Sequence, residues 1–456
     1  GCPMVHYYLA NARLYSRGRG FGPCGAYDGA GRRTVNQSDD LRKRLERLGV
    51  GLGLSGLRPR PEPAPAPPLR REAIEDWVSG RVVETASGPC FVSEVHYPLA
   101  HVHGSLALGA LLEHTPRSLG TLAGEPCDDE VAFERFAFLD TETTGLAGGT
   151  GTYAFLVGLG TFEDGEFVLR QCFMRDIPEE RAMLQVVHQV LGRSRGLVTF
   201  NGRGFDWPLL ETRFAMNRQA APAVVPPHLD LLMPARRVWR LRLQSCALSS
   251  LEAHVLGVVR GEADVPGWAI PGLYRDFLTY GRAEPLRRVF YHNAHDILSL
   301  ATLAAHLCAI AREPLAALKH GEDLYSLARR WEAEGQFERA IELYRQCLRC
   351  QLTPQARREA TRRLAQLHRR AGEEADALEL WHALAERGDV EACVELAKYY
   401  EHRTGDLAQA RRHALRALGL LRQMRYPDRR QLAQVEHRLE RLERKLRNLA
   451  GYEGEA

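Results

Sequence analysis

The chain has 456 residues, of which 45% are hydrophobic and 26% are charged. This length predicts two or three domains, and the composition is ordinary for a globular protein. The 61 Lys and Arg residues nearly balance the 57 Asp and Glu residues, so the net charge of +4 does not by itself indicate a nucleic-acid binder, although a balanced total can contain a basic groove.

Two features of the whole chain bear on its location. No apolar run approaches the roughly 20 residues needed to cross a bilayer, and the first residues lack the charged-then-apolar pattern of a signal peptide. The ten cysteines are scattered, and the one close pair, Cys347 and Cys350, has no second pair with which to complete a zinc site. We therefore expect structural cysteines, no membrane contact and a reducing, cytoplasmic location.

Residues 1–71 predict a poorly ordered N-terminal region. Within it, residues 38–50 carry leucines at helical spacing and predict one short amphipathic helix. Residues 59–68 contain six prolines in ten positions, which favours an extended spacer that cannot pack into a core.

Residues 72–314 predict an α/β domain. Residues 89–101 are compatible with one or two strands, to which we assign no role. Asp164 and Gly165 are a hairpin signal between two runs rich in aromatic and β-branched residues. The other elements expected in chain order are strands at 133–140, 152–162 and 166–174, a helix at 178–191, a strand at 196–202, a helix at 205–219 and a short strand at 228–232. This order is that of a ribonuclease H-like mixed five-stranded sheet flanked by helices.

Residues 315–456 predict an all-helical repeat domain. The segment 327–344 aligns with 364–381 at an offset of 37 residues, with small and aromatic residues in step. A third copy at 396–415 fits with one extra residue. Small residues where paired helices touch, with aromatic residues between them, are typical of tetratricopeptide-like (TPR-like) repeats. The last segment, 432–449, is either a capping helix for the repeats or a short coiled coil.

The segment FLDTETTGL places two acids, Asp140 and Glu142, at the end of a predicted buried strand. Side chains at i and i+2 of a strand lie on the same face, so these two carboxylates point the same way. Two like charges at a buried edge are costly unless a divalent cation neutralises them. Taken alone, the pair is also compatible with a polar strand end that leads into a turn.

Two further segments carry acids in a related pattern. Asp206 begins a helix after the strand end TFNG, and in a sheet of this order that strand lies beside the strand of Asp140. His292 and Asp296 are four residues apart and share one face of a helix. Alone, Asp206 could be a helix-start acid and the other two a surface pair. Together the three segments predict one acidic site.

The three motifs, in this order, resemble those of the DEDD superfamily of 3′→5′ exonucleases. LDTETTGL matches the first motif, FNGRGFD the second, and HNAHD, with its histidine before the final Asp, the third. Within that superfamily the chain resembles the YprB-type ribonuclease H-like proteins, which join such a domain to C-terminal TPR-like repeats. The resemblance covers residues 90–310 and extends loosely through the repeats.

The resemblance implies a metal-dependent nuclease that shortens DNA or RNA from its 3′ end. Four acids would hold two Mg²⁺ or Mn²⁺ ions, which prefer oxygen ligands. These acids are Asp140, Glu142, Asp206 and Asp296. His292 would accept a proton from the attacking water. The superfamily has one branch with a tyrosine four residues before the final Asp and another with a histidine five residues before it. Here His292 stands four residues before Asp296, and Tyr291 stands five before it. We favour His292 as the proton acceptor, because residues at i and i+4 share one helix face.

Other residues are candidates for substrate binding. Thr143 and Leu146 follow the first acids, where related enzymes hold the terminal nucleotide, although turn and core roles are equally compatible. Asn201 ends the strand of the second motif. The segment ARRVWRLRL places arginines such as Arg237 around Trp239, which suits contact with a single strand, with a solvated helix face as the alternative.

Three hypotheses about function follow. The first is an active exonuclease whose repeats dock a protein partner or guide the substrate. The second is a nucleic-acid-binding domain with weak or no turnover. The third is a TPR adaptor to which the nuclease is subordinate. The complete set of four acids favours the first.

Overall fold

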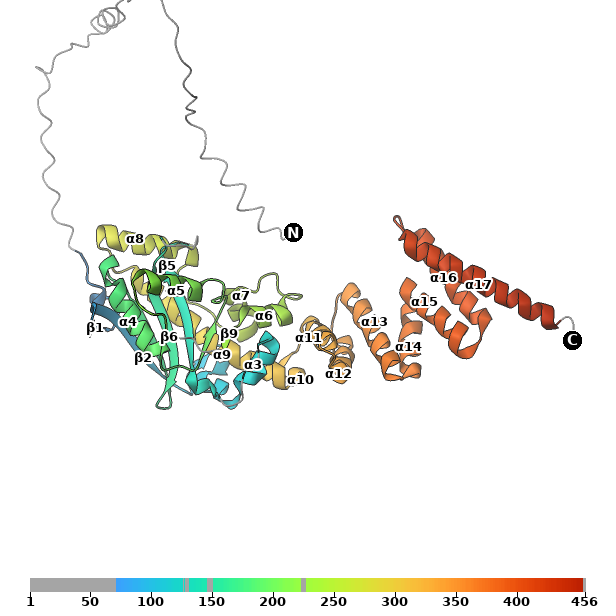
Figure 1. The fold of residues 1–456 in the computed structure, drawn as a ribbon, viewed down its shortest axis with the longest axis horizontal. Coiled ribbons are helices and arrows are strands. Elements are labelled where there is room, and N and C mark those ends of the chain that lie inside the picture. The colour runs from blue at the N-terminus through green and yellow to red at the C-terminus, as the bar shows by residue number, and fades with distance from the viewer. Residues whose placement is uncertain (1–70, 126, 128–130, 146–150, 223–226, 454–456) are drawn as a thin grey trace, which may run out of the picture. The chain divides into compact units, whose positions relative to one another are not determined.

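The computed structural model describes residues 71–453 except 126, 128–130, 146–150 and 223–226. The helix expected at 38–50 and the spacer expected at 59–68 lie outside the described residues. In the part that is described, a mixed sheet with flanking helices is followed by paired helices (Figure 1).

The main sheet has seven strands in the order β1-β2-β7-β6-β5-β8-β9. Strands β5, β6 and β7 are antiparallel neighbours, whereas β8 and β9 run parallel to β5. The strands are β1 (Arg81–Thr85), β2 (Gly88–Pro98), β5 (Phe136–Thr143), β6 (Ala154–Glu163), β7 (Glu166–Phe173), β8 (Gly196–Thr199) and β9 (His228–Asp230). A separate pair, β3 (Val102–His103) and β4 (Leu106–Ala107), forms a small hairpin.

The sheet therefore has two strands more than the five expected from the sequence. The β1–β2 hairpin extends the sheet beyond β7, because β2 pairs with the whole length of that strand. Its strand β2 overlaps residues 89–101, to which the sequence analysis assigned no role. The predicted turn between β6 and β7 is confirmed: Asp164 and Gly165 have φ values of 48° and 81°, as a two-residue type I′ hairpin requires.

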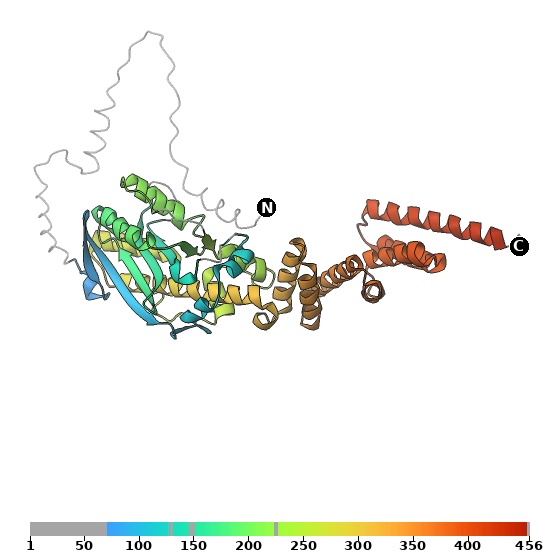
Figure 2. The same cartoon turned by 60° about the horizontal axis from the view of Figure 1, so that its bottom comes forward.

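Helices cover both faces of the sheet (Figure 2). Along β5, Phe136 and Phe138 pack with α9 (Leu286–Arg312) on one face. Ala137 and Leu139 pack with α4 (Glu180–Leu191) and α5 (Asp206–Met216) on the other. This alternation is the period of two that a strand buried on both faces imposes. The helices of this part are α3 (Pro116–Ala123), α4 (Glu180–Leu191), α5 (Asp206–Met216), α6 (Leu232–Trp239), α7 (Leu248–Leu251), α8 (Ile270–Tyr280), α9 (Leu286–Arg312) and α10 (Pro314–Ala317).

Helix α9 is 27 residues long and lies against β5, β6 and β7. By length and composition alone it is long and apolar enough to cross a membrane, so the expectation that no segment meets that criterion is wrong. In the structure, 67% of its most apolar window is buried. A core helix of a globular protein meets the same criterion.

The C-terminal part consists of helix pairs, as the repeat pattern predicts. Its helices are α11 (Gly321–Ala333), α12 (Phe337–Arg349), α13 (Pro354–Ala371), α14 (Glu374–Glu386), α15 (Val390–Tyr399), α16 (Leu407–Gln423) and α17 (Arg429–Glu453). The extra residue of the third copy is accommodated by a π-helical turn at Tyr400–Thr404. Val435, Leu439 and Leu442 of α17 are buried in the cluster that contains α16, which favours the capping helix over the coiled coil.

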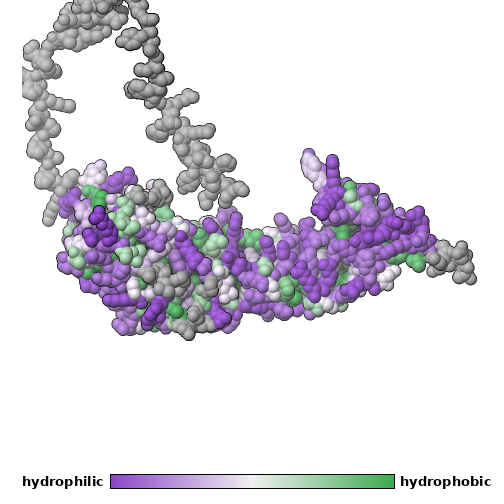
Figure 3. All heavy atoms as spheres, viewed as in Figure 1, coloured by the Kyte–Doolittle hydropathy of each residue, from purple (hydrophilic) through white to green (hydrophobic). Residues whose placement is uncertain are grey.

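The first helix pair shares its hydrophobic core with the sheet domain. One continuous cluster contains Trp239 of α6 together with Tyr325 and Trp331 of α11. Arg242 and Asp323 add an ion pair of 2.8 Å across the same junction. On the face shown in Figure 3, hydrophilic residues dominate the surface of the repeats and hydrophobic ones are scattered. Every cysteine among the described residues, including Cys347 and Cys350, is a free thiol.

Candidate active site

The site begins at the C-terminal end of β5. Because Phe138 faces α9, the alternation of the strand directs Asp140 and Glu142 toward the same helix. Both side chains are partly buried. The intervening Thr141 points to the opposite face, toward α5.

Asn293 of α9 fixes the first of these acids. Its side chain is 0% exposed, and its Nδ2 donates a 2.9 Å hydrogen bond to Oδ2 of Asp140. The amide of Gln171 donates in turn to Oδ1 of Asn293, at 2.9 Å. Gly158 is the cross-strand neighbour of Asp140, and a Cβ added there would overlap the Asn293 side chain. The glycine therefore lets α9 approach the sheet at the level of the acids, a role that the sequence analysis missed.

On the same helix, His292 directly precedes Asn293 and Asp296 follows it by three residues, and both lie close to Glu142. Nε2 of His292 is 3.6 Å from Oδ2 of Asp296, as the i, i+4 spacing predicts. One ligand atom from each of Glu142, His292 and Asp296 lies within 4.8 Å of the others. The structure thus brings together residues from β5 and α9 that are about 150 positions apart in the chain.

Asp264 orients the histidine. Its Oδ1 is 2.7 Å from Nδ1 of His292. Nη1 of Arg260 also lies 3.1 Å from the same nitrogen, and a guanidinium only donates. The shorter contact is with a carboxylate, which only accepts, so it favours the hydrogen on Nδ1 and the lone pair on Nε2, the nitrogen near Asp296. Asp264 lies in the loop before α8, where no motif or periodic pattern marks it, and the sequence analysis did not identify it.

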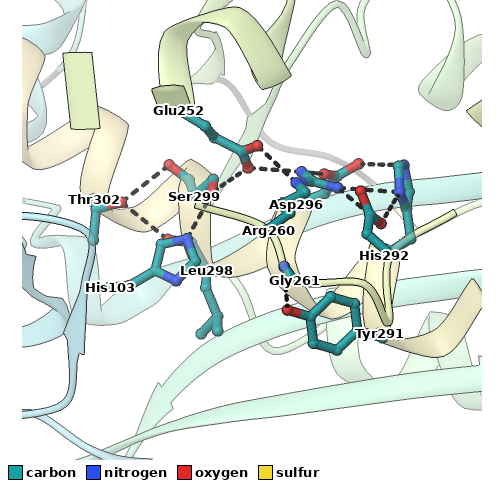
Figure 4. Close-up of polar contacts among 11 residues, drawn as sticks. His103, Glu252, Arg260, Gly261, Tyr291, His292, Asp296, Leu298, Ser299 and Thr302 are labelled. Atoms are coloured by element: carbon teal, nitrogen blue, oxygen red, sulfur yellow. Dashed lines mark hydrogen bonds and ion pairs between the residues drawn. The ribbon is translucent and has the colours of Figure 1, made fainter. Parts of the chain in front are cut away.

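Arg260, from the same loop, supplies positive charge beside the acids (Figure 4). It donates to Asp296, and its Nε and Nη2 donate to the two carboxylate oxygens of Glu252 at 2.7 and 2.6 Å. Glu252 is buried and also accepts a 2.5 Å hydrogen bond from Ser299, whose hydroxyl lies 2.8 Å from Nε2 of His103. The guanidinium is therefore held in one orientation by a buried chain of hydrogen bonds.

Asp206 approaches from α5. Its side chain is 5% exposed, and its Oδ1 accepts a 2.5 Å hydrogen bond from the hydroxyl of Thr141. Burial raises the pKa of Asp206 from its ordinary value of 3.8 to about 6, although the hydrogen bond from Thr141 opposes this shift. Asp206 is close enough to Asp140 and Glu142 for its negative charge to raise their pKa values.

The electrostatics of the site are those of crowded, poorly solvated carboxylates. Burial is the largest cause that raises the pKa of Asp140, followed by the charges of Asp296 and Asp206. Burial and the charge of Asp140 likewise raise the pKa of Glu142. Burial raises the pKa of Asp296 as well, even though Arg260 and His292 lower it. A bound cation would relieve the repulsion that these shifts express.

The donor set fits a hard divalent cation. Asp140, Glu142, Asp206 and Asp296 offer carboxylate oxygens, the donors that Mg²⁺ and Mn²⁺ prefer. Of these four, Glu142 and Asp296 share the ligand cluster with His292, whereas Asp140 and Asp206 are not part of it. No cysteine sulfur belongs to that cluster among the described residues. These four residues could hold such ions. The raised pKa values supply an independent reason, because the carboxylates are unfavourable as anions without a counter-charge.

Other candidates lie elsewhere. The Tyr291 hydroxyl accepts from the backbone N–H of Gly261 at 3.5 Å, and its ring packs on His295, so it points away from Asp296 (Figure 4). The Thr143 hydroxyl donates to the carbonyl of Gly145, at 3.0 Å. Leu146 lies outside the described residues.

The second motif forms a capped turn. Asn201 has a φ of 63°, and its backbone N–H donates to Oδ1 of Asp230 at 2.8 Å. Its side chain is exposed, which leaves the proposed contact with substrate open to experiment.

The base-stacking role expected for Trp239 is wrong. The indole is 1% exposed and stacks on His306 of α9, with ring centroids 5.9 Å apart. Arg237 donates to the backbone carbonyl of Leu122 and is partly exposed. The amphipathic pattern of α6 did not reveal that its aromatic side faces the core.

Comparisons with known proteins agree with this architecture. Residues 137–308 match the model of the ribonuclease H superfamily, and residues 323–418 match a tetratricopeptide repeat model. The chain is 30% identical over 332 residues to the uncharacterized protein YprB of Bacillus subtilis, an alignment that covers 70% of this chain and 78% of that protein. The superfamily match supports a nuclease in general. The chain therefore belongs to the YprB family, as a member of the ribonuclease H superfamily that carries tetratricopeptide repeats.

Proposed function

We propose that the protein is a divalent-metal-dependent 3′→5′ exonuclease that hydrolyses phosphodiester bonds of DNA or RNA. The observation that carries the proposal is the clustering of Glu142 from β5 with His292 and Asp296 from α9. Asp140 of β5 and Asp206 of α5 lie close enough for their charges to raise the pKa of Glu142. The order and spacing of the three motifs support the 3′→5′ class. Membership of the ribonuclease H superfamily supports nucleic acid as the substrate.

Each residue has a role that its surroundings support. Two bound Mg²⁺ or Mn²⁺ ions would activate the attacking water and stabilise the charge that develops on the phosphate. His292 accepts the proton released by the water through Nε2, because Asp264 holds the hydrogen on Nδ1. Glu252 holds the Arg260 guanidinium beside Asp296, so a fixed positive charge faces the site. Cleavage at the 3′ end would release a nucleoside monophosphate.

We also propose that the repeats dock a protein partner and that the protein acts in the cytoplasm. The tetratricopeptide match supports protein interaction. The free thiols of the described cysteines are compatible with a reducing compartment.

The polarity of degradation tests the proposal. Single-stranded DNA and RNA oligonucleotides, labelled at either end, are incubated with the protein and Mn²⁺ and resolved by length. A 5′ label should appear on a ladder of progressively shorter products, and a 3′ label should be released at once as a mononucleotide. Cleavage inside the strand, release of the 5′ label first, or no cleavage despite bound metal would overturn the 3′→5′ assignment, and the last result would favour a binding or adaptor role.

A further inference from the structure

A second basic feature lies at the junction between α6 and the first repeats. A cavity of about 620 Å³ opens there, and one acid, Glu332, is among its lining residues. Arginines from three helices or their ends dominate the lining: Arg236, Arg237 and Arg240 from α6, Arg329 and Arg330 from α11, and Arg363 and Arg370 from α13. The net charge of the whole chain is only +4, so this is a local concentration of positive charge.

Among the described residues, few carboxylates pair with these arginines. Arg330 pairs with Glu334, and Arg363 pairs with Glu332 at 3.1 Å. Within the described ranges, no carboxylate forms an ion pair with the four exposed arginines of the lining. These are Arg236, Arg240, Arg329 and Arg370.

Two details concern the guanidinium groups inside the cavity. Although Arg330 pairs with Glu334, its Nε is buried and makes no hydrogen bond with the described residues. The pKa of Arg237 is lowered by burial and, next, by the charge of Arg330. Clustered guanidinium groups repel one another, and an anion that enters between them removes this repulsion.

We propose that this arginine cavity binds backbone phosphates of the nucleic-acid strand whose 3′ end enters the acidic site. The inference rests on the proposed nuclease function and extends it to the upstream part of the substrate. Arginine presents planar pairs of donors that match phosphate oxygens. Arginines and no lysines line the cavity among the described residues. The cavity lies on an element of the sheet domain as well as on the repeats, which favours the strand over a partner of the repeats alone as its occupant.

Helix α9 gives the scale of this extended site. Asp296 and His306 are ten residues apart on α9, a rise of about 15 Å. His306 stacks on Trp239, the residue before Arg240. At about 3.4 Å per stacked nucleotide, a strand that followed α9 over this rise would need roughly four or five nucleotides. The cavity should therefore affect long substrates and leave the shortest ones unaffected.

Binding of a single-stranded 20-mer, measured by fluorescence anisotropy in EDTA, tests the proposal without requiring turnover. The variant Arg240→Ala/Arg329→Ala removes two exposed arginines of the cavity. The matched control, Arg412→Ala/Arg447→Ala, removes two exposed arginines from α16 and α17. We expect the first variant to bind the 20-mer at least about tenfold more weakly than the wild type. The slope of log Kd plotted against the logarithm of the salt concentration should fall by about 1.4, the value expected when two phosphate contacts with a single strand are lost.

Hydrolysis provides the second readout. The cavity variant should raise KM for the 20-mer and leave the rate on a dinucleotide unchanged, with an unaltered melting temperature. Equal binding by the cavity variant and the wild type would overturn the proposal. Polyglutamate serves as a second probe, which represents an acidic protein. If the cavity variant lost binding to polyglutamate but kept binding to the oligonucleotide, the proposal would also be overturned, in favour of an acidic protein partner. Failure of the nuclease proposal would appear separately, as oligonucleotide binding without cleavage.

Discussion

Asn293 donates a 2.9 Å hydrogen bond to the carboxylate of Asp140 and thereby joins the long helix α9 to the strand that carries the first acid. The bond forms in a space that Gly158 leaves open on the neighbouring strand. Since His292 and Asp296 lie on the same helix, the contact also sets their height above Glu142. The geometry of the site therefore depends on how closely α9 approaches the sheet.

Gly158→Ala should reduce both stability and activity. The new methyl group overlaps Asn293, so helix and sheet must separate, and overpacking of this kind costs about 1–3 kcal/mol. Urea unfolding and the hydrolysis rate measure the two effects. Gly419→Ala in α16 is the control, because its Cβ would meet no atom within 4 Å and should not destabilise the helix. Equal behaviour of the two variants would show that the close approach at Gly158 is unimportant.

Asp264→Asn should lower the rate about 10- to 100-fold, because an amide can donate to Nδ1 of His292 and favour the wrong tautomer. The pH dependence of kcat should change as well, which a purely structural role would not produce. Glu262→Gln, an exposed change in the same loop, should leave the profile unchanged. A wild-type pH profile for Asp264→Asn would remove Asp264 from the proposed mechanism.

The metal-free protein should lose stability as pH rises through about 6. The pKa of Asp206 is raised from 3.8 to about 6 in the fold, so folding favours its protonated form; the resulting stability is complete below about pH 4 and is lost as pH rises through 6. Above that pH, ion binding compensates. Mn²⁺ should therefore raise Tm by several degrees at about pH 7.5 and little at about pH 4.5.

Asp206→Asn should weaken both the pH dependence and the effect of Mn²⁺. Differential scanning calorimetry of the two proteins, with and without Mn²⁺, measures them together. An Mn²⁺ shift of the same size at both pH values would contradict the assignment of these carboxylates as ligands.

Arg260→Met should destabilise the protein by about 3–5 kcal/mol, because it leaves the buried Glu252 carboxylate without its charged partner. Adding Glu252→Gln to that variant should restore part of the loss. Arg287→Met, an exposed position on α9, should change stability by less than about 0.5 kcal/mol. Chemical unfolding of the three variants measures their free energies of unfolding and checks this order. An Arg260→Met protein as stable as the wild type would show that the buried network does not stabilise the fold.

Local sequence patterns were sufficient for much of the fold. The alternation along β5, the Asp164–Gly165 turn and the offset of 37 residues between repeats each depend on neighbours in the chain, and the structure contains all three. The β1–β2 hairpin was missed because its place beside β7 depends on long-range pairing. The hydrophobic pattern within a strand does not show which other strand it pairs with.

The site was predicted less completely than the fold. The acids and His292 lie in recognisable motifs, whereas Arg260 and Asp264 belong to an irregular loop and acquire their roles only through contact with α9. Trp239 shows the converse problem: a basic and aromatic segment resembles a strand-binding surface, but tertiary packing turned the indole into the core.

The most direct test of the central claim is the rate of oligonucleotide hydrolysis by Asp140→Asn at saturating Mn²⁺. Asp164→Asn, in the exposed hairpin turn at the opposite end of the sheet, is the control and keeps a residue that tolerates the positive φ found there. We predict an Mn²⁺-dependent wild-type rate that EDTA abolishes, a loss of at least about 100-fold for Asp140→Asn, and no change for Asp164→Asn. A wild-type rate for Asp140→Asn, or hydrolysis that persists in EDTA, would contradict the account.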